Sequence, residues 1–215
     1  MLKKALLFSG LSLAFATAFA DNGFFVGGDV GYVKSKSDVT IRDHYYYGYR
    51  DYQISGKDST GGIGIKGGYA WDWYRVYGAY NYVAPAKSTV EEAGHRWENK
   101  WATHDFVAGA DITPPITERF KLMAGAYVGL SVLNSEYRYK SPSYRYYYEE
   151  DVSQTGVVYG AKVGGIYEFM PHNALEFGVK AERADYADEE LWWDTEYRDR
   201  KRTNYGAFVG YTYKF

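Results

Sequence analysis

The chain has 215 residues, but it contains no cysteine and only 5 proline residues. Without disulfide bonds, its stability must come from burial and backbone pairing. The formal net charge is only −2, which argues against a nucleic-acid-binding protein, because such proteins carry a basic stripe. After the N-terminal segment, no apolar run reaches the ~18 residues of a transmembrane helix, so none is predicted in the remainder.

Aromatic residues and glycine are abundant instead, with 25 Tyr, 11 Phe, 6 Trp and 24 Gly. Aromatic rings pack well on the pleated surface of a sheet, so this composition favours strands. The mean hydropathy of the chain is −0.47. This value is compatible with a membrane barrel, because the strands of such a barrel are apolar only at every second residue.

The N-terminus has the pattern of a secretory signal peptide. Residues 1–4 form a short basic start, residues 5–18 are mostly apolar, and Ala18-Phe19-Ala20 gives a small-x-small cleavage pattern. We expect cleavage between Ala20 and Asp21, which divides the chain into a signal peptide (1–20) and a barrel domain (21–215). A lipoprotein signal is excluded, because the chain has no cysteine that could carry the lipid.

Eight later segments alternate between apolar and polar or small residues with a period of two. They cover residues 26–32, 62–71, 75–82, 105–112, 121–132, 157–169, 175–182 and 204–215. The connections 72–73, 114–119 and 170–172 are short, whereas 35–60, 84–103, 134–155 and 184–202 are long and charged. This pattern predicts an all-β fold, an eight-stranded antiparallel up-and-down transmembrane β-barrel with short periplasmic turns and four long extracellular loops.

The two faces of these segments differ in charge. One face carries no Asp, Glu, Lys or Arg, and we expect it to contact lipid. The other face carries six acidic and six basic residues, namely Asp29, Lys66, Arg75, Asp105, Asp111, Lys121, Lys162, Glu168, Glu176, Lys180, Glu182 and Lys214. We expect these charges to point into the lumen and to plug it, because an unpaired interior charge is costly. Asp29 and Lys66 are expected to face each other across adjacent strands and to pair.

The chain ends with Tyr211, Tyr213 and Phe215 at alternate positions. A final strand that closes on a C-terminal Phe resembles the terminal signature of bacterial outer-membrane barrels. The whole mature chain resembles the small OmpA/OmpX-like and opacity-type barrels, which are also grouped as porin-family proteins. The resemblance implies a monomer in the bacterial outer membrane, surrounded by lipid and lipopolysaccharide, whose terminal signature is read by the barrel assembly machinery.

Candidate chemistry is sparse in this sequence. The four histidines show no metal-binding spacing, and we predict neither a metal ion nor a cofactor. His104 and Ser131 could belong to a lipid-modifying site, but the alternation points Ser131 into the lumen and His104 towards lipid, so they cannot share a proton. We therefore expect a protein that is not an enzyme. A narrow channel for small solutes is the second hypothesis, and a lipid-A-modifying enzyme is the third.

Two of the long loops concentrate tyrosine with arginine. The candidate binding residues are Tyr45, Tyr46, Tyr47, Tyr49, Arg50, Tyr144, Arg145, Tyr146, Tyr147 and Tyr148. Tyr and Arg give large contact areas and adaptable hydrogen bonds, as in antibody paratopes. These loops predict a structural or adhesive role, with a host protein, a glycan or lipopolysaccharide as partner. The alternative is that the tyrosines pack on one another above the membrane.

Overall fold

The computed structural model describes residues 22–45, 48–92, 95–140, 147–187, 189–191 and 195–215. The strands are β1 (Gly23–Tyr45), β2 (Gly48–Ala70), β3 (Tyr74–Glu92), β4 (His95–Ile112), β5 (Phe120–Lys140), β6 (Tyr147–Met170), β7 (Asn173–Tyr186), β8 (Glu189–Leu191) and β9 (Thr195–Lys214). Within these ranges, no helix is long and apolar enough to cross a membrane.

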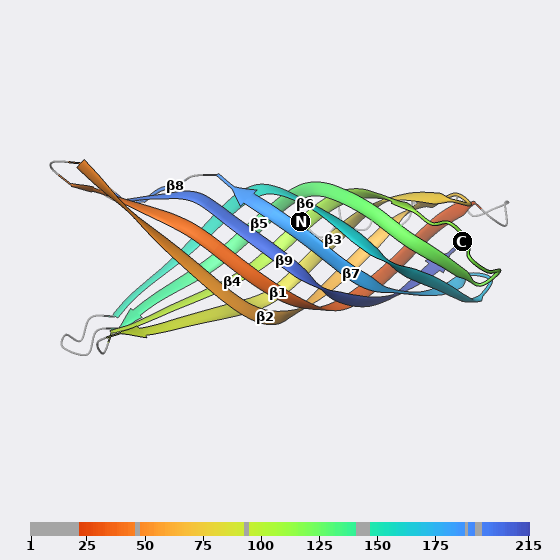
Figure 1. The fold of residues 1–215 in the computed structure, drawn as a ribbon, viewed down its shortest axis with the longest axis horizontal. Helices are drawn as coiled ribbons and strands as arrows, with labels where there is room; N and C mark the ends of the chain where they lie inside the picture. The colour runs from red at the N-terminus through yellow and green to blue at the C-terminus, as the bar shows by residue number, and fades with distance from the viewer. Residues whose placement is uncertain (1–21, 46–47, 93–94, 141–146, 188, 192–194) are drawn as a thin grey trace, which may run out of the picture.

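The strands form one antiparallel sheet that closes on itself (Figure 1). Successive long strands pair with each other, and β9 returns to pair with β1 along almost its whole length. The three-residue β8 pairs with β9 beyond the end of β7, so that β7 and β8 together occupy one position in the wall. The expected closed eight-stranded barrel is therefore confirmed.

The two ends of the barrel differ. At one end the strands are joined by residues 71–73, 113–119 and 171–172, as expected for short turns. The prediction of four long loops at the other end was wrong, because most of those residues continue the strands. β1 and β2 stay paired up to Tyr45 and Gly48, and β5 and β6 stay paired up to Lys140 and Tyr147. At the left of Figure 1 these hairpins extend past the wall and spread apart.

An apolar belt surrounds the half of the barrel nearest the short turns. On its outer face Val30, Ile65, Val128 and Val179 are each 55% to 65% exposed. Exposed aromatic side chains flank these residues, namely Tyr74, Tyr167, Phe169, Tyr213 and Phe215 towards the short turns, and Tyr32, Phe106, Tyr159 and Tyr205 towards the hairpins. Such a surface requires an apolar solvent, and closure of the sheet leaves no unpaired edge in it.

Above the belt, the polarity of the wall inverts. Trp101, Leu133, Val158 and Ala184 point inward there and are almost completely buried in one apolar cluster. The outer face is now polar, and its first charged side chain on each strand in turn is Lys34, Lys57, Lys87, Lys100, Glu136, Asp151, Arg183 and Lys201. The hairpin half of the barrel therefore has the surface and core of a protein segment that stands in water.

The side chain of Trp101 allows a test of this upper core. Its indole Nε1 donates a hydrogen bond of 3.1 Å to Ser35 Oγ, and both residues are buried. Ser35→Ala leaves that buried donor without an acceptor, so we expect a loss of about 1–3 kcal/mol in the free energy of unfolding. Urea titration of the refolded protein in lipid vesicles measures this loss.

Ser37 offers a matched control on the same face of β1. It is also buried, but its side chain makes no hydrogen bond to the described part of the chain. We expect Ser37→Ala to change stability by less than about 0.5 kcal/mol. Equal effects of the two substitutions would contradict the role given to the indole hydrogen bond.

Candidate functional site

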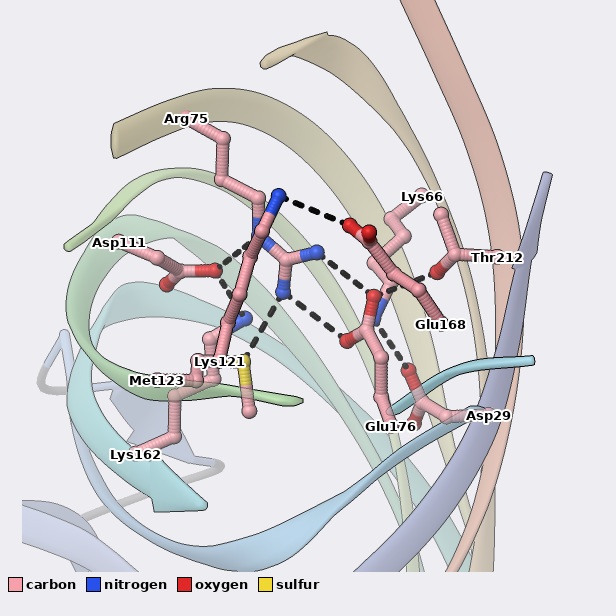
Figure 2. A network of polar contacts seen from close by, with 10 residues as sticks. All are labelled: Asp29, Lys66, Arg75, Asp111, Lys121, Met123, Lys162, Glu168, Glu176 and Thr212. Atoms are coloured by element: carbon pink, nitrogen blue, oxygen red, sulfur yellow. Dashed lines mark hydrogen bonds and ion pairs between the residues drawn. The ribbon is translucent and has the colours of Figure 1, made fainter. Parts of the chain in front are cut away.

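A network of buried ion pairs crosses the lumen inside the apolar belt, with Arg75 of β3 at its centre (Figure 2). Arg75 Nε donates to Asp111 Oδ2 at 2.6 Å. Its Nη1 and Nη2 donate to the two carboxylate oxygens of Glu176 at 2.6 and 2.9 Å. Glu176 lies on β7, across the lumen from β3, and is 0% exposed. The fork of Arg75 therefore ties opposite walls of the barrel together.

Glu176 collects further donors from two other strands. Lys66 Nζ of β2 lies 2.6 Å from Glu176 Oε2, and the hydroxyl of Thr212 of β9 donates to Oε1. Lys66 Nζ also lies 3.9 Å from Asp29 Oδ2, so the predicted Asp29–Lys66 pair exists. The predicted register was wrong, however, because Lys66 faces Gly27 and Asp29 faces Gly64. Lys66 thus reaches Asp29 diagonally, and its shorter contact is with Glu176.

Lys162 of β6 completes the network on the other side of Arg75. Its Nζ lies 3.1 Å from Asp111 Oδ2 and 4.2 Å from the centroid of the Tyr77 ring. Arg75 in turn has its Nη2 2.9 Å from Met123 Sδ. These contacts compensate the charge of buried groups within the low-dielectric part of the barrel, where an isolated charge could not stay ionised.

A second polar network lies higher in the lumen and is centred on Arg202 of β9. Its Nη2 donates to Asp105 Oδ2 at 2.9 Å and to Glu182 Oε1 at 3.2 Å. Glu182 also accepts hydrogen bonds from Asn204 at 2.9 Å and from the Tyr127 hydroxyl at 2.8 Å. Arg200, one inward position further along β9, donates to Gln154 at 2.8 Å.

Side chains leave little free space in this lumen. A cavity of about 30 Å³ lies between the two networks and is lined by Asp29, Lys66, Tyr77 and Lys180 among others. A cavity of about 50 Å³ opens at the short-turn end. Each has room for at most a few water molecules. Inner glycines make this close filling feasible, since a Cβ atom on Gly109 would lie 2.5 Å from the Tyr77 hydroxyl.

All twelve predicted lumen charges are buried or half-buried. At least ten of them form ion pairs, and these include Lys121 with Glu168 at 2.8 Å at the short-turn mouth. Arg200 and Arg202 were not predicted as lumen residues, because both were expected to lie in the loop 184–202. The signal was present, since they continue the inward alternation of Asn204 along β9.

His104 and Ser131 lie on opposite faces of the wall, as expected. His104 Nδ1 is 2.7 Å from the Tyr80 hydroxyl on the outer face. Ser131 is fully buried, and its hydroxyl donates to Asp105 and lies 2.8 Å from the Tyr186 hydroxyl. Among the described residues, no cluster of three or more His, Asp or Glu side chains is arranged to hold a metal ion.

The C-terminal signature residues Tyr211, Tyr213 and Phe215 lie on the outer face, each 38% to 44% exposed. The Phe215 amide donates to the Phe24 carbonyl at 2.9 Å, which fixes the end of the chain to β1. Recognition of this signature by an assembly machinery stays a prediction.

Of the predicted binding residues, Tyr49 has a described side chain. Tyr49 is 63% exposed at the start of β2. The predicted residues Tyr46, Tyr47, Tyr144, Arg145 and Tyr146, and the cleavage site at Ala20 and Asp21, lie outside the described residues. Tyr45, Arg50, Tyr147 and Tyr148 belong to strands, but their side chains are likewise outside the described part.

Several solved structures match most of the chain. The chain is similar to Neisserial surface protein A (NspA), with a TM-score of 0.53 and 16% identity, over 90% of this chain and 97% of that chain. AlkL in lipid bilayers gives a TM-score of 0.49 and 14% identity, over 93% of each chain. Ail of Yersinia pestis, solved with the heparin analogue sucrose octasulfate, gives a TM-score of 0.42 and 16% identity, over 86% of this chain and 99% of that chain. No protein-family model and no curated protein matches the chain.

Proposed function

We propose that this small β-barrel of the bacterial outer membrane is a non-enzymatic surface protein that acts outside the cell, in a structural or adhesive role. The observation that carries the proposal is that the two halves of the barrel differ along its axis. Within the belt, Arg75, Asp111 and Glu176 fill the lumen and hold the walls together. Beyond the belt, the strands continue as hairpins with a polar outer face. The part of the molecule available to a partner is therefore the hairpin half.

The tyrosine-rich segments occupy the far ends of two hairpins. Tyr45 and Gly48 are the last pair of the β1–β2 hairpin, and Lys140 and Tyr147 are the last pair of the β5–β6 hairpin. Tyr45, Tyr49, Tyr147 and Tyr148 thus lie on a paired backbone, which reduces the entropy lost on binding. Tyr and Arg at such positions suit a protein or glycan partner.

Removing both hairpin ends tests the adhesive role. We expect deletion of Tyr45–Tyr49 together with Tyr144–Tyr148 to leave the barrel folded, because the paired strands and the upper core remain. Heat-modifiable gel migration reports folding, and attachment to host cells or to extracellular matrix reports binding. A folded double deletion that attaches as well as the parent protein would overturn the adhesive proposal and leave the structural role.

The narrow-channel hypothesis makes a different prediction for planar bilayers. We expect the refolded protein to show no steady conductance on the nanosiemens scale, because Arg75 and Glu176 cross the lumen and are fixed by four strands. Repeating the recording with Arg75→Ala provides a positive control for blockage by this network. Steady conductance of the parent protein would favour the channel.

The third hypothesis is a lipid-A-modifying enzyme, and the Ser131–His104 pair that suggested it is not in contact. Ser131 and His104 are separated by the wall, and the hydrogen-bond partners of Ser131 are Asp105 and Tyr186 inside the lumen. Analysis of lipid A from cells that produce the protein provides the readout. A new acylation state of lipid A would contradict the non-enzymatic proposal.

A further inference from the structure

Four lysines gather on the outer surface directly above the apolar belt, where β9, β1 and β2 lie side by side. Lys34 and Lys36 belong to β1, Lys57 to β2 and Lys201 to β9, and we call them the lysine patch. Lys36 is the direct cross-strand neighbour of Lys57, and Lys201 is the cross-strand neighbour of Asp38, two residues above Lys36. Four cationic side chains therefore occupy one small area of the wall.

The charge of the lysine patch is only partly compensated. Lys36 Nζ lies 2.6 Å from Asp38 Oδ2, and the Ser55 hydroxyl also donates to Asp38. Partial burial acts to raise the pKa of Asp38, but hydrogen bonds from Lys36 and Ser55 and the charges of Lys36 and Lys57 lower it below its usual value. Within the described part of the chain, Lys34 and Lys57 form no ion pair.

Lys36 and Lys57 are directly opposite each other on adjacent strands, and this position is unfavourable for the isolated protein. Like charges directly opposite each other on adjacent antiparallel strands are destabilising. Such an arrangement becomes favourable when an anion lies between the two ammonium groups. Asp38 compensates one of these two charges, so the cross-strand pair keeps a net positive charge that an anion from outside the chain can balance.

The height of the lysine patch identifies where that anion lies. Tyr32 and Tyr205, which are 55% and 53% exposed, end the apolar belt on β1 and β9. Lys34 is two residues beyond Tyr32 and is paired with Tyr205, so it stands only ~7 Å above the belt at the strand rise of ~3.4 Å per residue. This is the level at which lipid headgroups begin.

The other side of the barrel differs at the same height. Lys87 and Lys100 of β3 and β4 lie 2.9 and 3.9 Å from Glu98 Oε1. Lys100 also lies 3.6 Å from Glu136 of β5. On β6 the first outward charge is acidic, at Asp151. Among the described residues at this height, Lys87 and Lys100 therefore have carboxylate partners, whereas Lys34 and Lys57 do not.

We propose that the lysine patch binds the phosphate groups of lipid A in the outer leaflet of the membrane. A phosphate offers several oxygen acceptors to neighbouring ammonium groups, and lysine binds it as a point charge. The acyl chains of the same lipid then lie against the apolar belt below Tyr32 and Tyr205. This inference goes beyond the proposed function, because it concerns the lipid around the barrel and requires nothing of the hairpin ends.

The test compares the thermal unfolding midpoint of the refolded protein in phosphatidylcholine bilayers with and without diphosphoryl lipid A, read by heat-modifiable gel migration. We expect lipid A to raise the midpoint of the parent protein, and monophosphoryl lipid A to raise it less. In Lys34→Gln/Lys57→Gln, most of this rise should disappear. In pure phosphatidylcholine the same variant should be about as stable as the parent, because both lysines are exposed surface residues.

The matched control is Lys87→Gln/Lys100→Gln, which removes two lysines at the same height that already have carboxylate partners. This control should keep the rise given by diphosphoryl lipid A. The proposal is overturned if the patch variant keeps the full rise, if both double variants lose it equally, or if lipid A with one and with two phosphates acts alike. High salt should reduce the rise of the parent, because exposed charges are screened.

Discussion

Replacing Glu176 with glutamine is expected to destabilise the refolded barrel by about 3–5 kcal/mol, because it leaves the buried charges of Lys66 and Arg75 without their shared partner. Glu176 is 0% exposed and accepts hydrogen bonds from Lys66, Arg75 and Thr212. Urea titration in lipid vesicles, followed by tryptophan fluorescence, gives the free energy of unfolding.

Glu168→Gln is the control for this experiment. Glu168 also points inward and lies 2.8 Å from Lys121, but the two side chains are 33% and 22% exposed at the mouth of the barrel. Water screens that pair, so we expect a loss of no more than about 1 kcal/mol. Adding Lys66→Met to Glu176→Gln should recover part of the lost stability, since it removes one uncompensated charge. Equal losses for Glu176→Gln and Glu168→Gln would contradict the role of burial.

Val128→Arg is expected to cost about 2–4 kcal/mol, because it places a cation in the hydrocarbon near the middle of the belt. Val128 is 55% exposed on the outer face of β5, between Leu122 near the short turns and Val132 near the upper edge of the belt. The same urea titration measures the loss, provided that the vesicles have a bilayer of normal thickness.

Asn134→Arg on the same strand and the same face separates depth from substitution chemistry. Asn134 lies six residues above Val128, where the outer face has become polar, and it is exposed. We expect a change within about 0.5 kcal/mol, as for an ordinary surface substitution. If Asn134→Arg were as damaging as Val128→Arg, the belt would extend further along β5 than its side chains indicate.

The alternation of residues was enough to predict the closed sheet and the short turns, and it assigned twelve charges to the inward face. It could do so because a period of two assigns each side chain to one face whatever the partner strand is. The same argument failed above the belt. There Val33, Trp101 and Leu133 are apolar residues on the inward face. The apolar outer face of β1 therefore ends at Tyr32, and the residues beyond it were predicted to form a loop.

The partners of the lumen charges could not be predicted from alternation. Arg75 and Glu176 belong to β3 and β7 and meet across the lumen. Their contact depends on the closure of the whole sheet and on the lengths of both side chains, and neither follows from the faces of single strands. Even the Asp29–Lys66 pair required the true register, in which the two residues are offset along their strands.

The pairing of β9 with β1 has a consequence for the rates of folding and unfolding. Every other pairing of long strands joins neighbours along the chain, and only this one joins the two ends. Local hairpins form at low entropic cost, whereas this pairing must close almost the whole chain and is therefore slow. The contacts of Glu176 with Arg75 and Lys66 span the lumen, so they become complete only when that ring has closed. Glu176→Gln should accordingly act mainly by accelerating unfolding, while the refolding rate stays close to that of the parent protein.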